Sequence, residues 1–298
     1  MIKIIDKWRQ GIFILLSFLC FAIFFLTSLN LNTQIQSYIL FFLVSLIGIP
    51  HGFFDFSIGK NIFQRFRKLW LLYFVSIYIL ITFFYFSIWI YLPGIALISF
   101  LLIASYHFGY EEFNYLGKNR HSFINLSIFI KGLIIVFTPV LFHYEQVSRL
   151  FSILVGYDLT KFEFTDFQKN TFIALSIFHV LFEKARDMFY KIECLIYLIN
   201  FIFLPPLISF ILYFCFSHSI KHFLESIYIS KNVPDNFSVK NFLVLIISCS
   251  VIISFISVIF ISKYHDISLS ISIIKFIFIS LACLTLPHMI FNMIPNRK

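Results

Sequence analysis

Residues 206–229 read PLISFILYFCFSHSIKHFLESIYI. A run of about 20 mainly apolar residues is long enough to cross a bilayer as one α-helix. This run carries His218, Lys221 and His222 in its second half, and ionisable groups inside a span are rare and usually point into a helix bundle. The stretch therefore predicts a membrane-spanning helix that contributes to a buried polar site.

The apolar composition extends along the whole chain. Of the 298 residues, 60% are hydrophobic and 12% are charged, and the mean hydropathy is +0.93. Soluble proteins carry about 25% charged residues, so the composition excludes a soluble globular protein. We expect an all-α fold, a polytopic helical bundle that forms a single transmembrane domain over residues 1–298.

About ten segments, and at least eight, are long and apolar enough to be spans. They lie near residues 11–29, 37–58, 69–91, 94–113, 122–142, 167–183, 188–204, 206–229, 240–262 and 267–292. The first is expected to be retained, because no small-x-small cleavage site follows it. The sixth is the weakest, being short and flanked by polar residues. A short surface helix is expected around 145–156.

Basic residues indicate how the spans are oriented. Under the ten-span scheme most of the 23 Lys and Arg residues, Arg9 among them, flank the spans on the side of the N-terminus. Basic residues prefer the cytoplasmic side, so both termini are predicted to be cytoplasmic, in the cell inner membrane. The net charge of +9 is thereby explained without nucleic acid as a partner. Five isolated cysteines are expected to be buried, reduced thiols.

Histidines are the residues that point most clearly to function. Five of the nine lie inside predicted spans that run in the same direction: His51, His107, His218, His222 and His288. Four of them lie about nine to eleven residues before the next cytoplasmic basic residue, roughly 13–17 Å along a helix. One such histidine is commonly a hydrogen-bonding partner between helices, but a layer of five predicts a shared site.

The predicted site is a metal site. It is formed by the spans near 37–58, 94–113, 206–229 and 267–292. Imidazole is a common metal ligand, and residues four apart share one face of a helix. His218 and His222 can therefore bind one ion from one helix, while two other helices approach it through His51 and His107.

Carboxylates follow two of these histidines at the same spacing. Asp55 lies four residues after His51, and Glu111 lies four residues after His107. A histidine that binds a metal usually donates its second ring N–H to a carboxylate or carbonyl. Each carboxylate is therefore expected to orient the histidine that precedes it.

Further polar residues accompany the motifs. His288, Tyr106 and Tyr110 are expected to line the site and the space for a substrate. Lys221 points off the face shared by the two histidines beside it, so we expect it to extend to the membrane interface or to pair with Glu225.

The metal is left open by the ligand type, because zinc, copper and iron all accept imidazole. Gly52 and Gly109 adjoin two of the motifs and permit the close approach of helices that a shared site requires. A site within lipid favours an apolar substrate, which offers few groups for hydrolysis. Oxygen chemistry on iron is therefore the expectation.

The motifs, taken together, have a familiar order. They are PHG-x-x-D at 50–55, HFG-x-E at 107–111, H-x-x-x-H at 218–222 and T-x-PH at 285–288. This set resembles the Brp/Blh family of membrane β-carotene 15,15′-dioxygenases, and the likeness extends over about residues 45–290. The chain departs from the pattern at Phe56, where many relatives carry a further histidine.

The resemblance implies an iron(II) enzyme that cleaves the central double bond of β-carotene with O₂ into two molecules of all-trans-retinal. The retinal would supply a microbial rhodopsin in the same cell. The implied catalytic iron ligands are His51, His107, His218 and His222. Asp55, Glu111 and His288 match further motif positions and are expected beside these ligands.

Two other functions fit a histidine-rich membrane protein. A di-iron desaturase or hydroxylase would act on lipid, but such enzymes typically carry several histidine boxes and this chain has a single H-x-x-x-H. A metal or proton transporter would place histidines along a path and often shows repeated halves. The expected single layer of histidines and the lack of a sequence repeat favour the oxygenase.

Overall fold

All regular elements that the structure describes are helices, as predicted. The computed structural model describes residues 2–27, 31–114, 126–159, 162–182, 188–229 and 239–294. Its α-helices are α1 Ile2–Leu26, α2 Thr33–Leu43, α3 Asp55–Phe63, α4 Trp70–Tyr91, α5 Pro93–Asn114, α6 Leu126–Phe142, α7 Tyr144–Val155, α8 Asp166–Phe182, α9 Met188–Phe203, α10 Pro206–Ile211, α11 Ile220–Ile229, α12 Val239–His265 and α13 Leu269–Met293. Four short irregular helices are η1 Val44–Gly48, η2 Ile49–Phe54, η3 Gln64–Leu69 and η5 Leu212–Ser219.

The prediction of ten spans is not confirmed. Among the described residues, six helices are long and apolar enough to cross a membrane, and a seventh span exists if α6 and α7, which meet at an angle of 105°, are counted together. The predicted segments are helical, but α8 has 17 residues and α9 has 16. The predicted span 37–58 is interrupted, because α2 gives way to η1 and η2 before α3 begins.

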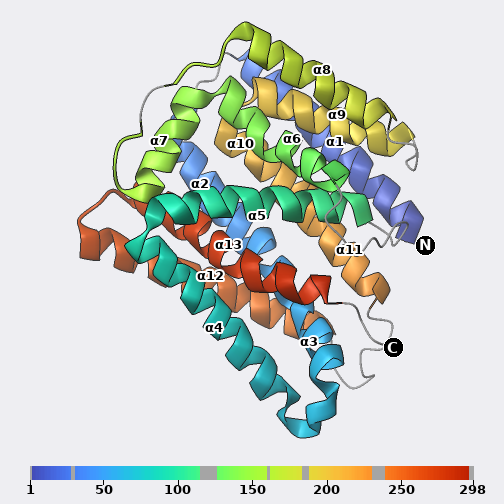
Figure 1. Ribbon diagram of the computed structural model, residues 1–298, viewed down its shortest axis with the longest axis vertical. Coiled ribbons are helices and arrows are strands. Elements are labelled where there is room, and N and C mark those ends of the chain that lie inside the picture. The colour runs from blue at the N-terminus through green and yellow to red at the C-terminus, as the bar shows by residue number, and fades with distance from the viewer. Residues whose placement is uncertain are drawn as a thin grey trace.

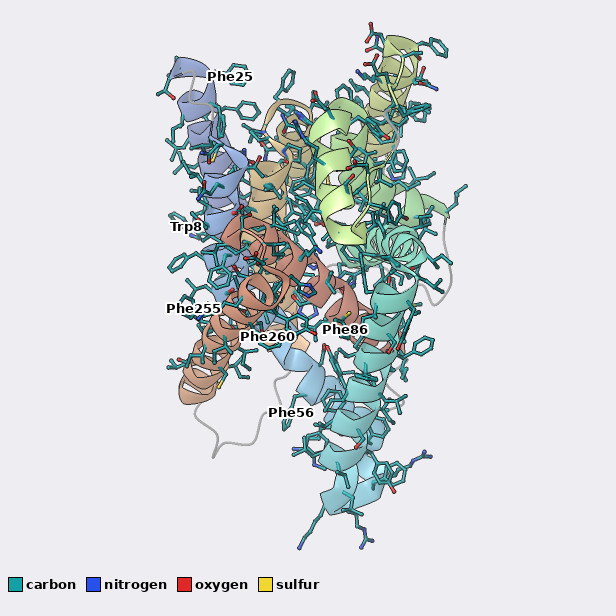
Figure 2. All side chains as sticks on the ribbon, turned by 90° about the vertical axis from the view of Figure 1, so that its left-hand side faces the viewer. Trp8, Phe25, Phe56, Phe86, Phe255 and Phe260 are labelled. Carbon is teal, nitrogen blue, oxygen red and sulfur yellow. The ribbon has the colours of Figure 1, made fainter. Side chains whose placement is uncertain are left out.

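The helices pack around a central pair. Helices α5 and α13 contact each other in the middle of the bundle and run in the same direction as α10, η5 and α11 (Figure 1). Helix α4 packs on α13 and α5, and α12 packs on α13, while α1 and α6 pack on α9. Aromatic side chains such as Trp8, Phe25, Phe255 and Phe260 project from the outer surface (Figure 2), as expected for a surface in contact with lipid.

Two irregular stretches meet beside the centre of the bundle. Both η1 and η5 are π-helices, and π-turns inside α-helices are frequent at functional sites. They contact each other, and a Cβ on Gly48 would lie 2.6 Å from the Phe214 ring. This close fit places η5, which carries His218, against the broken second span.

The glycine prediction is confirmed at Gly109. A Cβ on Gly109 would overlap the carbonyl oxygen of Ile128, and one on Gly132 would overlap the carbonyl of Ser105. The backbones of α5 and α6 therefore touch at these glycines. Among the described residues, a Cβ on Gly52 would come within 4 Å of the Asp55 side chain alone, at 3.7 Å.

Two further predictions need correction. The short helix expected around 145–156 exists as α7, but it packs on α5, α6 and α13 and has three buried apolar residues. It is part of the bundle because one of its faces is apolar. The cysteines are free thiols, but Cys249 is exposed and Cys20 is half-buried, since both lie on helices with a lipid-facing side.

Candidate metal centre

Four histidine side chains from separate stretches of the chain converge in the core. His107 lies on α5, His218 on η5, His222 on α11 and His288 on α13, and all four are buried. The ring centre of His107 is 5.1 Å from that of His218 and 5.2 Å from that of His288. The rings of His222 and His288 are 4.7 Å apart. The predicted layer of histidines is thus a cluster in space.

Each of these three separations is one that a pair of rings bound to the same ion can have. With a metal–nitrogen bond of about 2.1 Å, as zinc makes, the ring centre lies about 3 Å from the metal. Two rings that bind one ion at angles between a right angle and the tetrahedral angle then have centres roughly 4.5–5.3 Å apart. The three separations, 4.7, 5.1 and 5.2 Å, fall in this range.

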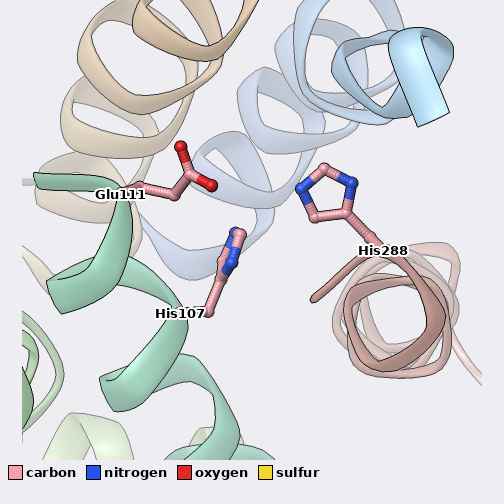
Figure 3. A group of neighbouring side chains, drawn as sticks. All are labelled: His107, Glu111 and His288. Atoms are coloured by element: carbon pink, nitrogen blue, oxygen red, sulfur yellow. The ribbon is translucent and has the colours of Figure 1, made fainter. Parts of the chain in front are cut away.

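A carboxylate completes the cluster. One ligand atom from each of His107, Glu111 and His288 lies within 4.8 Å of the others. Figure 3 shows the Glu111 carboxylate extending from α5 into the space between the two imidazoles. Two histidines and one carboxylate are the donor set of non-haem iron(II) oxygenases. Glu111, expected to orient His107 from outside, therefore lies where it can itself be a ligand.

A hydrogen-bonded chain holds His288 in place. Its Nδ1 atom lies 2.7 Å from Oδ1 of Asp55, and the hydroxyl of Tyr78 donates to Oδ2 of Asp55 at 3.0 Å. Where the carboxylate is ionised it only accepts hydrogen bonds, and Nδ1 is then the donor of this contact. The amide nitrogen of Asn292 lies 3.2 Å from Nε2.

Asp55 has a partner that the sequence did not predict. The spacing in sequence suggested His51, four residues earlier, and the structure pairs Asp55 with His288 on α13. Asp55 is the first residue of α3, directly after the break at η2. The His51 side chain lies outside the described residues, so its predicted role as a ligand stays a prediction.

Aromatic rings surround His218. The ring of Phe214 stacks on it at 5.5 Å, and Phe108 meets it edge-on at 4.9 Å. Tyr106 and Tyr110 stack on each other at 6.0 Å, and neither lines the two cavities described below.

Phe56 is partly exposed and also borders a cavity beside His288. It is 37% exposed and packs edge-on against Trp70 at 4.8 Å, and it is labelled in Figure 2. It also lines the cavity whose wall includes Asp55 and His288. The position at which many relatives carry a further histidine therefore adjoins this cavity in this chain.

A buried ion pair lies behind the cluster. The ammonium group of Lys221 is 2.8 Å from both carboxylate oxygens of Glu112, and both side chains are buried. It also donates to the hydroxyl of Tyr197 at 2.6 Å. The prediction that Lys221 reaches the interface is wrong, because its side chain is buried against a carboxylate on α5. Glu112 is likewise buried and not solvated. The Glu225 side chain lies outside the described residues, so the predicted pairing with it stays a prediction.

A second ion pair extends this network to the first helix. The guanidinium of Arg9 binds both carboxylate oxygens of Glu193, at 2.6 and 3.0 Å, and donates to Asp6 at 2.8 Å. Glu193 also accepts from Tyr197 at 2.6 Å and lies 3.3 Å from the Lys221 ammonium. Arg9 was expected to be an exposed orientation signal, but it is 4% exposed, because its partner lies on the neighbouring helix α9.

Two cavities adjoin the histidine cluster. Chamber A, with a volume of about 120 Å³, lies between α5, α6, α7, α9, α10, η5 and α13 and has an almost wholly apolar lining. Chamber B, of about 380 Å³, lies between η2, α3, α4, α12 and α13 and includes Asp55, Tyr78 and His288 in its wall. Leu281 and Thr285 line both chambers.

Comparison with known proteins identifies the family. The sequence model of the β-carotene 15,15′-dioxygenase family matches residues 42–293. The chain belongs to this family. A curated relative, the β-carotene 15,15′-dioxygenase of uncultured marine bacterium 66A03, is 30% identical over 257 residues, which cover 83% of this chain and 90% of the relative. No solved structure matches the chain.

The family match contains every element that carries a histidine of the cluster. It begins after α1, so Asp6 and Arg9 lie outside it although Arg9 is paired in the core. Lys221, Tyr78 and the network around Glu193 were missed by sequence reasoning. The only signal in the sequence for these contacts was an ionisable residue inside a predicted span. Such a residue does not indicate which side chain it pairs with.

Proposed function

We propose that this protein cleaves the central double bond of β-carotene with O₂ to give two molecules of all-trans-retinal, and that the histidine cluster holds the iron(II) that supports the reaction. The observation that carries the proposal is the cluster itself, which offers imidazole and carboxylate donors beside two apolar cavities. Membership of the dioxygenase family gives the substrate class.

The donor set fits iron. We propose His107, His218, His222 and His288 as the imidazole ligands, with Glu111 as a carboxylate donor and His51 as a further candidate. Neutral imidazoles and a carboxylate suit iron(II), and no thiolate is needed. Bound iron(II) would supply the activation of O₂, whose direct reaction with a polyene is slow.

The reaction consumes one molecule of each substrate. The central C=C bond and the O=O bond break, and two C=O bonds form, so each new aldehyde receives one oxygen atom if both come from the same O₂. No proton or external electron is consumed. The protein therefore has to bind and position the two substrates and to exclude water.

Its own residues are placed for that task. The carboxylate of Asp55 fixes the tautomer and the orientation of His288, and Tyr78 in turn fixes Asp55. The Phe108 and Phe214 rings surround His218 and keep water from it. The apolar walls of chamber A match a hydrocarbon, which gains free energy by leaving water or lipid headgroups for an apolar cavity.

The cellular setting is part of the proposal. The long apolar helices fit a membrane protein. β-Carotene dissolved in the surrounding lipid would then have direct access to it. We propose the cell inner membrane with both termini cytoplasmic, from the distribution of basic residues, and a microbial rhodopsin as the consumer of the retinal.

Expression in a bacterial host that makes β-carotene tests the function. The wild-type chain is expected to bleach the orange cells and to yield retinal on chromatography. Cells with an empty vector, and cells expressing the chain with His218→Ala, are expected to stay orange. Orange cells that contain well-folded, iron-loaded wild-type protein would contradict the proposal.

A further inference from the structure

We infer that chambers A and B receive the two ends of the polyene, and that the stacked aromatic rings of chamber A determine which double bond lies at the metal centre. This inference rests on the proposed function and adds to it the part of the protein that selects the bond.

The two chambers meet beside the histidine cluster. Leu281 and Thr285 on α13 line both chambers, and Thr285 lies three residues before His288. His288 itself lines chamber B. On the other side, Phe108 and Phe214 line chamber A and contact the His218 ring. An extended chain that passes from one chamber to the other therefore passes the cluster between its two ends.

Chamber A follows three helices away from the histidines. Apart from Phe108, which directly follows His107, its lining residues on α5, on α10 with η5, and on α13 precede the histidine of the same stretch, and these helices run in the same direction (Figure 1). Phe278 lies ten residues before His288, which corresponds to roughly 15 Å along a helix. The chamber is thus elongated, as an extended polyene requires.

Stacked phenylalanine rings line the part of chamber A that lies away from the histidines. Phe210 stacks on Phe214 at 5.2 Å between ring centres and packs on Phe278 at 5.2 Å. The chamber volume of about 120 Å³ is close to the roughly 150 Å³ of an apolar cavity that binds benzene. Chamber A therefore holds one ring-sized group unless its phenylalanine side chains change conformation. Chamber B is larger, with a volume of about 380 Å³.

The narrow chamber is consequently the one that sets the register. A polyene that enters chamber A until its end ring meets Phe210 and Phe278 has one particular double bond opposite Leu281 and Thr285. Moving that stop moves the bond. Because β-carotene is symmetric, any shift in register changes the products from two equal aldehydes to two unequal ones.

The test is the ratio of products formed from β-carotene. Phe210→Ala removes one ring of the stop, so the substrate enters deeper and unequal aldehydes appear beside retinal. We expect their ratio to retinal to rise about tenfold or more, the discrimination that a small change in an apolar pocket gives. Val75→Trp, on the chamber B wall at a position 39% exposed to lipid, shortens the other chamber and is expected to shift the ratio as well.

The control is Phe255→Ala, the same change on the outer surface (Figure 2), which is expected to give only retinal. The ratio of unequal aldehydes to retinal does not depend on yield, so a poorly expressed variant can still be tested. If Phe210→Ala gives no product, the product ratio of Val75→Trp decides. Retinal as the sole product of both chamber variants would overturn the inference and leave the proposed function intact. A wild-type protein that leaves β-carotene uncleaved would overturn both.

Discussion

His107→Ala is expected to lose bound iron and retinal formation together. The His107 ring stands between those of His218 and His288, about 5 Å from each, so its removal opens the middle of the cluster. Loss of a residue that merely orients a ligand lowers metal affinity or activity by about 10–100-fold. Loss of a central ligand should exceed that range, and iron per protein together with retinal per iron would measure it.

The matched control is His265→Ala. His265 lies at the exposed end of α12 and should leave iron content and activity at wild-type levels. A purified His107→Ala protein that keeps one full equivalent of iron would show that the ring is not a ligand.

Lys221→Met is expected to destabilise the protein and to weaken iron binding without removing a ligand. The ammonium is shared by Glu112 and Glu193 in a buried setting, and breaking a buried ion pair from one side costs about 3–5 kcal/mol because the other charge stays behind. Glu112 adjoins Glu111, and Lys221 adjoins His222, so a shift at this pair reaches the cluster. Unfolding in detergent and iron titration would measure the two effects.

A double variant separates charge from packing. Lys221→Met combined with Glu112→Gln removes both charges, and we expect it to recover part of the lost stability, since residues in one network do not act additively. Lys263→Met, at an exposed position near the end of α12, is the control. A Lys221→Met protein as stable as the wild type would mean that the pair contributes nothing.

The helical class and the meeting of the histidines were predictable from sequence for a definite reason. Apolar runs identify helices in a membrane, and counting residues from a charged end gives the depth of a side chain. Depth placed His107, His222 and His288 at one level, and the structure brings their rings together.

The depth of a residue in the membrane does not indicate the direction in which its side chain points around the helix axis. Nor does it indicate whether the helix is regular along its length. The π-helix η1 and the 3₁₀-helix η2 interrupt the second span. Pro50 can kink a helix, but it does not indicate the form or the length of this break. Asp55 turned out to pair with His288 on another helix. The count of ten spans was not confirmed for a related reason, since apolar helices such as α8 and α9 are short.

The buried ion pairs were missed in the sequence for a different reason. A basic residue near the start of a first span is typical of an orientation signal, and Arg9 was interpreted as one. Its partner Glu193 is 184 residues away in sequence. Only the packing of α1 on α9 shows that the charge is neutralised in the core.

Turnover of β-carotene by metal-free protein reloaded with a single metal tests the central claim most directly. Protein stripped of metal, then given iron(II) or zinc in detergent with β-carotene and O₂, is expected to form retinal with iron and none with zinc or without metal. Equal retinal formation by the iron-loaded and metal-free protein, or none from the iron-loaded one, would contradict an iron oxygenase at this cluster.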